Sequence, residues 1–94
     1  MASTYLDEPE GALSPARQLA FLRALHDVTH TRIAQFIVAT HSPMLLAFPG
    51  ATVLQIETGR TAATPYQKTE HYALTRAFLE EPERFFRFLF AEDE

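Results

Sequence analysis

Several residue types are missing or scarce in this sequence of 94 residues. It has no cysteine, which excludes disulfide bonds and thiolate metal sites and permits a reducing compartment. The net charge is −4 and the eight basic residues are scattered singly, so no basic surface for nucleic acid or for an anionic membrane is indicated. No apolar run approaches the ~20 residues that a membrane-spanning helix needs. We therefore expect a soluble, cytoplasmic protein without nucleic-acid or membrane partners.

What is present is the composition of a folded domain. Apolar residues make up 47% of the chain, and eight residues are phenylalanine, which excludes disordered and collagen-like classes. A chain of 94 residues supports one small domain at most. Such a domain buries roughly 65% of the surface that its unfolded chain exposes, so its stability is expected to be marginal.

The acidic stretch Tyr5-Leu6-Asp7-Glu8-Pro9-Glu10 organises the rest of the chain. An aromatic residue and a leucine precede two adjacent acids and a proline follows them, which is typical of a strand that ends abruptly at a polar site. Asp7 and Glu8 should point to opposite sides of an extended backbone. One carboxylate could then hold a cation while the other handles a proton or a water. A solvated turn is the alternative interpretation.

Two further elements follow this stretch. Ser14-Pro15 is a strong helix start, with serine as N-cap and proline at the first helical position, so a helix is predicted from residue 15 to about 28. Residues 33–39 form a nearly continuous apolar run without alternation, which predicts a strand buried on both faces. That strand ends at Thr40-His41-Ser42-Pro43. The helix carries an apolar stripe that should pack against a core, formed by Leu19, Leu22 and Leu25.

The second half of the chain has weaker signals. A short helix or turn is expected at residues 44–48, and residues 52–57 alternate as a strand with one solvated face. Thr58-Gly59-Arg60 indicates a tight turn into a return strand at 61–64. Helices are predicted from Thr69 and again from Glu81-Pro82. The second of these should contribute core side chains, namely Phe85, Phe86, Phe88 and Phe90.

This order of elements predicts an α/β layer in which the first two strands pair in parallel. Ligands of open parallel sheets bind beyond the carboxyl ends of the strands, where Asp7, Glu8 and His41 would emerge together. A carboxylate beside a divalent cation, a second carboxylate that polarises water and a histidine that contacts a phosphoryl oxygen suit metal-assisted phosphoanhydride hydrolysis.

Three segments in order, Leu6 to Glu10, Ala12 to Pro15 and Ala39 to Pro43, resemble the C-terminal half of an ABC-type P-loop ATPase domain. The similarity is to the AAA-labelled, non-transporter branch of that family, and it extends over almost the whole chain, including residues 70–82. It implies that residues 1–94 are a single partial domain. The implied fold is a partial P-loop NTPase-type layer, with a short, mainly parallel sheet, an edge strand or hairpin, flanking helices and a C-terminal helical pair.

The resemblance also implies roles for individual residues. Asp7 matches the Walker B aspartate that supports Mg²⁺, usually through water, and Glu8 matches the catalytic glutamate. The segment from Gly11 to Ser14 matches the D-loop, which crosses a dimer interface near the nucleotide, and His41 matches the switch histidine that senses the γ-phosphate. The implied activity is the binding and hydrolysis of ATP, with Mg²⁺ as cofactor.

The phosphate-binding motif G-x-x-x-x-G-K-[ST] does not occur in the sequence. Its three glycines are isolated, and its only lysine, Lys68, lies in no glycine-rich loop. The family's signature helix and glutamine loop are absent as well. We therefore expect a split or truncated ATPase that needs a separate N-terminal half-domain, with a homodimer through the D-loop as another possible partner. The alternative is a non-catalytic, truncated remnant that acts as an interaction module.

Two other pairs of residues could carry chemistry, but each also has a purely structural interpretation. His26 and His30 are four residues apart and could clasp a metal ion from one face of a helix. A solvated helix end is the favoured alternative, because the helix should end there. Ser42 beside His41 resembles a nucleophile with its base, but adjacent residues rarely direct their side chains at each other and no G-x-S-x-G elbow exists. We reject the second arrangement.

Overall fold

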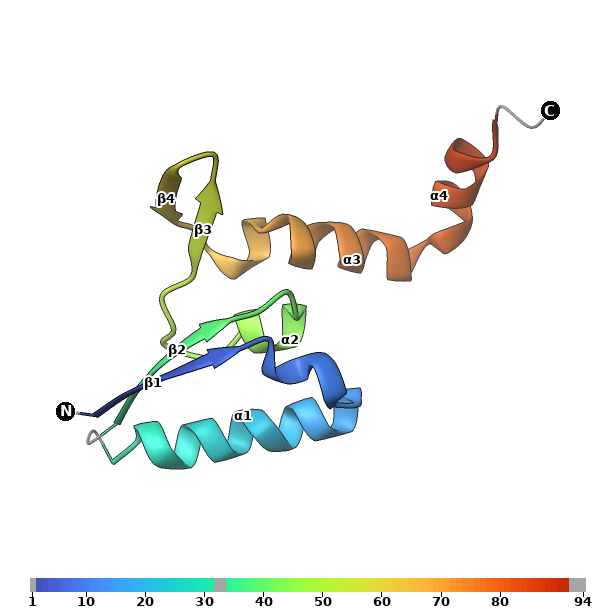
Figure 1. The fold of residues 1–94 in the computed structure, drawn as a ribbon. Coiled ribbons are helices and arrows are strands. Elements are labelled where there is room, and N and C mark those ends of the chain that lie inside the picture. The colour runs from blue at the N-terminus through green and yellow to red at the C-terminus, as the bar shows by residue number, and fades with distance from the viewer. Residues whose placement is uncertain (1, 32–33, 92–94) are drawn as a thin grey trace. The chain divides into compact units, whose positions relative to one another are not determined.

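The computed structural model describes residues 2–31 and 34–91. They group into two compact units, Met1–Ala51 and Thr52–Glu94 (Figure 1). Within the described residues the fold is mixed α/β, with one parallel and one antiparallel pair of strands and four α-helices. The predicted α/β class is thereby confirmed. None of the helices in the described part of the chain combines the length and the apolarity that a membrane crossing requires.

The first unit is built on two parallel strands, β1 (Ala2–Asp7) and β2 (Ala34–Ala39), joined by helix α1 (Pro15–Thr29). Leu6 lies opposite Val38 in the register, and Asp7 lies opposite Ala39. Helix α1 runs alongside the strand pair (Figure 1), as a crossover between parallel strands must. The predicted parallel pairing is confirmed.

Local chemistry explains where the helices of this unit begin. The hydroxyl of Ser14 accepts a hydrogen bond from the backbone N–H of Arg17 at 3.2 Å, and Pro15 occupies the first turn, where no N–H is needed. The short helix α2 (Pro43–Leu46) begins in the same way, because the hydroxyl of Ser42 accepts from the N–H of Leu45 at 3.3 Å. The start of α1 agrees with the sequence-based prediction, whereas α2 begins one residue before the predicted helix or turn at residues 44–48 and ends at Leu46.

The prediction that the second strand is buried on both faces was wrong. Phe36 and Val38 are half-buried, whereas the side chain of Ile37 between them is 55% exposed. Tyr5, its partner in the register, is exposed as well. The reason is the size of the sheet: within the described residues it has two strands, and α1 packs against one of its faces. The stripe on α1 is also only partly covered, since Leu19 stays exposed.

The second unit begins with a hairpin of β3 (Leu54–Glu57) and β4 (Arg60–Ala63). Its two-residue loop is Thr58-Gly59, and both residues have positive φ, 34° and 78°. A type I′ loop requires this, and its twist matches that of the strands. The predicted hairpin is confirmed, although the return strand starts at Arg60. The expectation of one solvated face was wrong in its detail, because the apolar Leu54 and Ile56 are themselves exposed.

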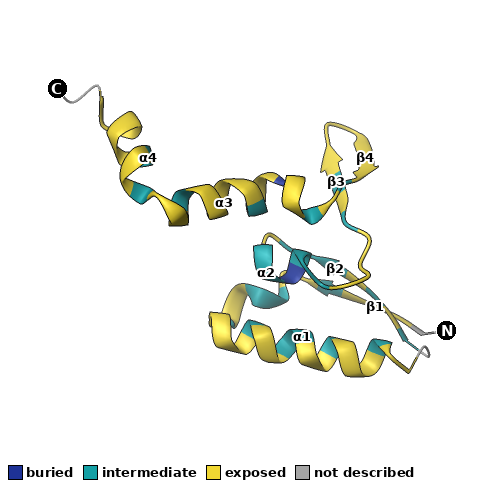
Figure 2. Cartoon of the chain, turned by 180° about the vertical axis from the view of Figure 1, so that it is seen from behind, coloured by how far each residue is buried: buried dark blue, intermediate teal, exposed yellow. Residues whose placement is uncertain are grey.

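Two helices complete the second unit, α3 (Glu70–Glu80) and α4 (Pro82–Leu89), as predicted. The Phe78 ring of α3 meets the rings of Phe85 and Phe86 edge to face, with centroids 5.6 Å apart in each case. The prediction that Phe85, Phe86, Phe88 and Phe90 are core residues was wrong in part, because Phe88 is 83% exposed whereas Phe85 is half-buried. Figure 2 shows exposed surface along most of α3 and α4. The exposed members also include Phe86 and Phe90.

Thr69 holds the start of α3 and offers a test of the fold. Its hydroxyl donates to the carbonyl of Tyr66 at 2.7 Å and accepts from the N–H of Tyr72 at 3.3 Å, and the residue is 3% exposed. Thr69→Val keeps the shape but removes both bonds, so we expect a loss of about 1–2 kcal/mol in the free energy of unfolding. Urea denaturation followed by circular dichroism measures it. Thr69→Ser should retain most of the stability; a Thr69→Val protein as stable as the native chain would contradict the capping role of the hydroxyl.

Candidate functional site

The carboxyl ends of β1 and β2 lie at the same edge of the parallel pair. Asp7 is aligned with Ala39, and the backbone N–H of the next residue, Glu8, donates to the carbonyl of Ala39 at 2.7 Å. The residues that follow each strand therefore leave the sheet side by side. This is the place where open parallel sheets bind ligands, and it contains the predicted site residues Asp7, Glu8 and His41.

The structure brings Glu8 and His41 together. The Oε1 atom of Glu8 lies 3.6 Å from Nε2 of His41. The two side chains form an ion pair when the imidazole is protonated. Both side chains remain more than half exposed, 58% for Glu8 and 67% for His41, so a solvent-borne ligand can reach either group. A carboxylate and an imidazole at this separation can both contact one water, and each is exposed enough to contact a ligand from solvent as well.

The backbone at Glu8 differs from the predicted one. Its φ and ψ are 47° and 55°, in the left-handed region, so the extended backbone stops at Asp7. The prediction that the two acids lie on opposite sides of one extended segment was therefore wrong. A non-glycine residue with positive φ is uncommon and costs about 1–3 kcal/mol, and such residues cluster at functional sites. The left-handed turn occurs at the residue whose carboxylate lies beside His41.

Asp7 ends β1 with an exposed carboxylate. No group of three or more histidine, cysteine, aspartate or glutamate side chains that could hold a metal ion is found within residues 2–31 and 34–91. A single carboxylate nevertheless fits Mg²⁺, which keeps several waters and takes its remaining ligands from substrate phosphates. Asp7 is thus suited to a cation that arrives with a phosphate ligand, and not to a metal site made of protein atoms alone.

Gly11 and Ser14 lie in the connection between β1 and α1. Gly11 is part of the 3₁₀-helix η1 (Pro9–Ala12), and its N–H donates to the carbonyl of Glu8 at 3.1 Å, so it follows the site directly. Ser14 is exposed, but its hydroxyl oxygen already caps α1 by accepting from Arg17. The structure therefore gives Ser14 a role in helix capping, and its part in binding a nucleotide stays a prediction.

Glu10 and Thr40 were missed as site residues by sequence reasoning. One oxygen of Glu10, Oε1, accepts from the hydroxyl of Thr40 at 2.7 Å, and the other, Oε2, accepts from the backbone N–H of His41 at 3.1 Å. The two residues stand inside the motifs that carry the family resemblance. However, a hydrogen bond between positions 30 residues apart leaves no periodic signal.

Charge and burial act against each other at Glu10. Burial alone raises the pKa of its carboxyl, but hydrogen bonds from Thr40, from its own backbone and from the N–H of His41 outweigh that effect. The charge of the His41 imidazole, when it is protonated, acts in the same direction, and the net result is a pKa below the ordinary value for glutamate. Glu10 is therefore ionised at neutral pH, and charged acceptors make the stronger hydrogen bonds.

Ser42 has a structural role in the site. It is 7% exposed, and its hydroxyl donates to Oε1 of Gln18 on α1 at 2.5 Å while its oxygen caps α2. Its N–H donates to the hydroxyl of Thr40 at 3.0 Å. These bonds tie the end of β2 to both helices. They agree with the rejection of Ser42 as a nucleophile.

The histidine pair on α1 lies near the helix end and not at this edge. The rings of His26 and His30 stack with centroids 5.5 Å apart, and both residues are exposed. No third ligand joins them among the described residues. The arrangement corresponds to a solvated helix end.

Comparison with protein-family models, with curated proteins and with solved structures finds no match for this chain. The site is therefore described by its geometry alone. An exposed carboxylate–imidazole pair, Glu8 and His41, lies at the carboxyl edge of two parallel strands, and the exposed carboxylate of Asp7 precedes Glu8 in the chain.

Proposed function

We propose that this chain binds and hydrolyses ATP as the C-terminal part of an ABC-like, AAA-type P-loop ATPase domain. One observation carries the proposal: the parallel pairing of β1 and β2 brings the Glu8 carboxylate within 3.6 Å of the His41 imidazole, at the ligand-binding edge of the sheet. The motifs of residues 6–15 and 39–43 support the same assignment.

Each of the three polar side chains has a distinct task in this proposal. Glu8 orients the attacking water and accepts its proton, because its carboxylate is exposed and faces the imidazole. His41 donates a hydrogen bond to an oxygen of the transferred phosphoryl group, on which negative charge spreads during the reaction. Asp7 holds Mg²⁺ through water, and the cation, when bound, neutralises phosphate charge.

The phosphate cradle is the part that residues 1–94 do not encode. A nucleotide triphosphate is normally held by a row of backbone N–H groups and a lysine, and the only lysine here is Lys68. We propose that a separate N-terminal half-domain, a polypeptide outside this sequence, supplies the loop. A homodimer across residues 11–14 would bring no such loop, since each copy lacks the motif, and it is proposed only as a further contact.

Calorimetry with Mg-ATP tests the assignment. The 94-residue chain alone should give no measurable heat, which corresponds to a dissociation constant weaker than about 1 mM, because the phosphate contacts are missing. Together with a half-domain that carries G-x-x-x-x-G-K-[ST], it should bind ATP and release inorganic phosphate. The same half-domain with its loop lysine changed to alanine is the control. A mixture that binds ATP yet never releases phosphate would contradict the catalytic assignment.

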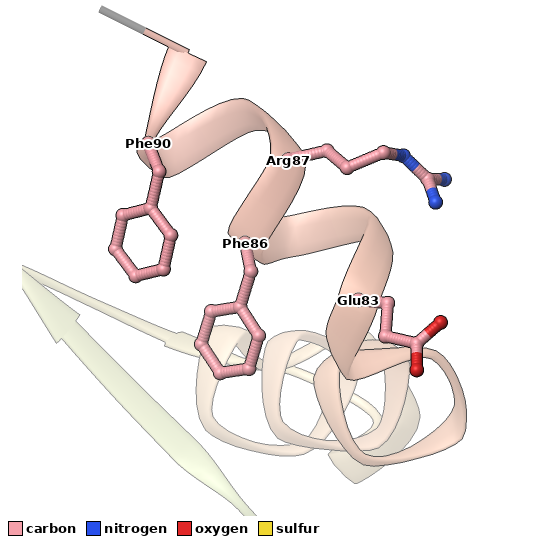
Figure 3. A pocket seen from close by; sticks show the side chains of 4 residues that line it. All are labelled: Glu83, Phe86, Arg87 and Phe90. Carbon is pink, nitrogen blue, oxygen red and sulfur yellow. The ribbon is translucent and has the colours of Figure 1, made fainter. Parts of the chain in front are cut away.

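A second candidate function is that of a non-catalytic interaction module. The observation that favours it is the aromatic surface at α4, where Phe86, Phe90, Glu83 and Arg87 line a pocket. Figure 3 shows the two rings on one side of the helix and the two charged side chains on the other. Exposed apolar patches commonly mark protein contacts. A partner that binds equally well after Glu8→Gln, together with an absence of ATP turnover in every mixture, would favour this module.

A further inference from the structure

The carboxylate of Glu10 joins the ends of the two parallel strands. It lies on η1, directly after β1, and it binds the residues that follow β2 with both of its oxygens: the Thr40 hydroxyl at 2.7 Å and the His41 N–H at 3.1 Å. Both bonds connect the segment after β1 to the segment after β2. Glu10 is half-buried, whereas Glu8 is exposed.

The bonds of Glu10 belong to a chain of contacts that holds one corner of the fold. Thr40 accepts from the N–H of Ser42 at 3.0 Å, and Ser42 in turn donates to Gln18 on α1. The backbone on both sides of His41 is thereby fixed to η1 and to α1. The imidazole is the part of this corner that reaches toward Glu8.

We propose that Glu10 is the positioning residue for His41: its carboxylate fixes the Thr40–His41 corner so that the imidazole faces Glu8. In this scheme Glu10 touches no reacting atom; each of its oxygens accepts a hydrogen bond from the corner. The effect of Glu10 on ATP hydrolysis rests on the proposed function. The hydrogen bonds that link Glu10 to Thr40 and His41 do not depend on it.

The ionic state of Glu10 strengthens the link. A charge-assisted bond to an N–H or O–H donor is about twice as strong as a neutral one. The groups that act on the carboxylate are the Thr40 hydroxyl, the N–H and imidazole of His41 and its own backbone, so within the described residues His41 is the titratable group that acts on it. Because the pKa of Glu10 is lowered in the folded chain, the link is complete at neutral pH and weakens as the pH falls through that lowered value.

Nuclear magnetic resonance on the whole 94-residue chain tests the link without any nucleotide. The amide proton of His41 should shift with the ionisation of Glu10, as followed by the side-chain carboxyl carbon. Glu10→Gln should abolish that acidic transition at His41, while Glu83→Gln, an exposed glutamate of α4, should leave it unchanged. A His41 amide that does not follow the Glu10 titration would overturn the proposal.

A second pair of variants covers the case in which Glu10→Gln does not fold. Thr40→Ser keeps the hydroxyl that donates to Glu10, and Thr40→Val keeps the shape without it. In the ATP-hydrolysing assembly, Thr40→Val should lower kcat about tenfold with KM for ATP nearly unchanged, because His41 is misplaced and not removed. Thr40→Ser should restore most of kcat.

The two readouts separate the possible failures. If the native assembly shows no ATP turnover but the His41 amide follows Glu10, the proposed function fails and the positioning link stands. If turnover is present and kcat is the same with Thr40→Val as with Thr40→Ser, the positioning role is overturned while the ATPase assignment stands.

Discussion

Glu8→Gln should lower ATP hydrolysis by about 10²–10³-fold in the assembly that contains the phosphate loop, while ATP stays bound. The amide keeps the size and one acceptor oxygen of the carboxylate, but it cannot accept the proton of the attacking water. Release of phosphate over time measures turnover, and retention of radiolabelled ATP measures binding.

The geometry at Glu8 gives this variant a clear interpretation. The side chain of Glu8 is exposed and faces His41, and the positive φ places the same demand on glutamine as on glutamate. The fold should therefore be unchanged. Glu81→Gln makes the same chemical change at an exposed position before α4, and it should retain full turnover. A Glu8→Gln protein that loses ATP binding in proportion to turnover would show that Glu8 acts in binding and not in proton transfer.

The elements that could be predicted from the sequence are those with local chemistry at their ends. Ser14-Pro15 marked the start of α1 because a hydroxyl acceptor and a proline solve the problem of the unpaired N–H groups within one turn. Thr58-Gly59 marked the hairpin because a type I′ loop needs positive φ at both positions. The same kind of signal at Pro82 separated α3 from α4.

Burial could not be predicted in the same way. An apolar run such as residues 34–39 shows which side chains are able to be buried, but it does not show what covers them. In the described chain α1 packs against one side of the strand pair, so Ile37 is exposed next to half-buried Phe36 and Val38. The phenylalanines of α4 illustrate the same point: among the described residues, Phe85 and Phe86 contact the Phe78 ring of α3, and Phe86 also stacks on Phe90.

The candidate site likewise has features that could be predicted from the sequence and features that could not. Asp7, Glu8 and His41 were predictable as neighbours because parallel strands end at a common edge. The left-handed backbone of Glu8 was not, since nothing in its side chain requires it. The bond between Glu10 and Thr40 was also hidden, because it joins two loops through a tertiary contact that no spacing rule encodes.

Leu45→Ala should produce the largest loss of stability in the first unit, about 3 kcal/mol in the free energy of unfolding. Leu45 is 6% exposed and is the one apolar residue classed as buried among the described residues. It lies on α2, which packs against α1, so truncation leaves a cavity at that contact. Small domains have only about 5–15 kcal/mol in total, so a loss of this size is readily measured.

The place of Leu45 in the chain connects this stability to the site. Its N–H binds the Ser42 hydroxyl, which also reaches Gln18, so the packing of α2 supports the corner that carries His41. Hydrogen exchange of β2 amides, measured in urea, should report the destabilisation of the first unit. Leu79→Ala on α3 is the matched control, because that leucine is 68% exposed and should cost less than about 1 kcal/mol. Equal losses in the two variants would mean that the packing of the first unit does not depend on the α1–α2 contact.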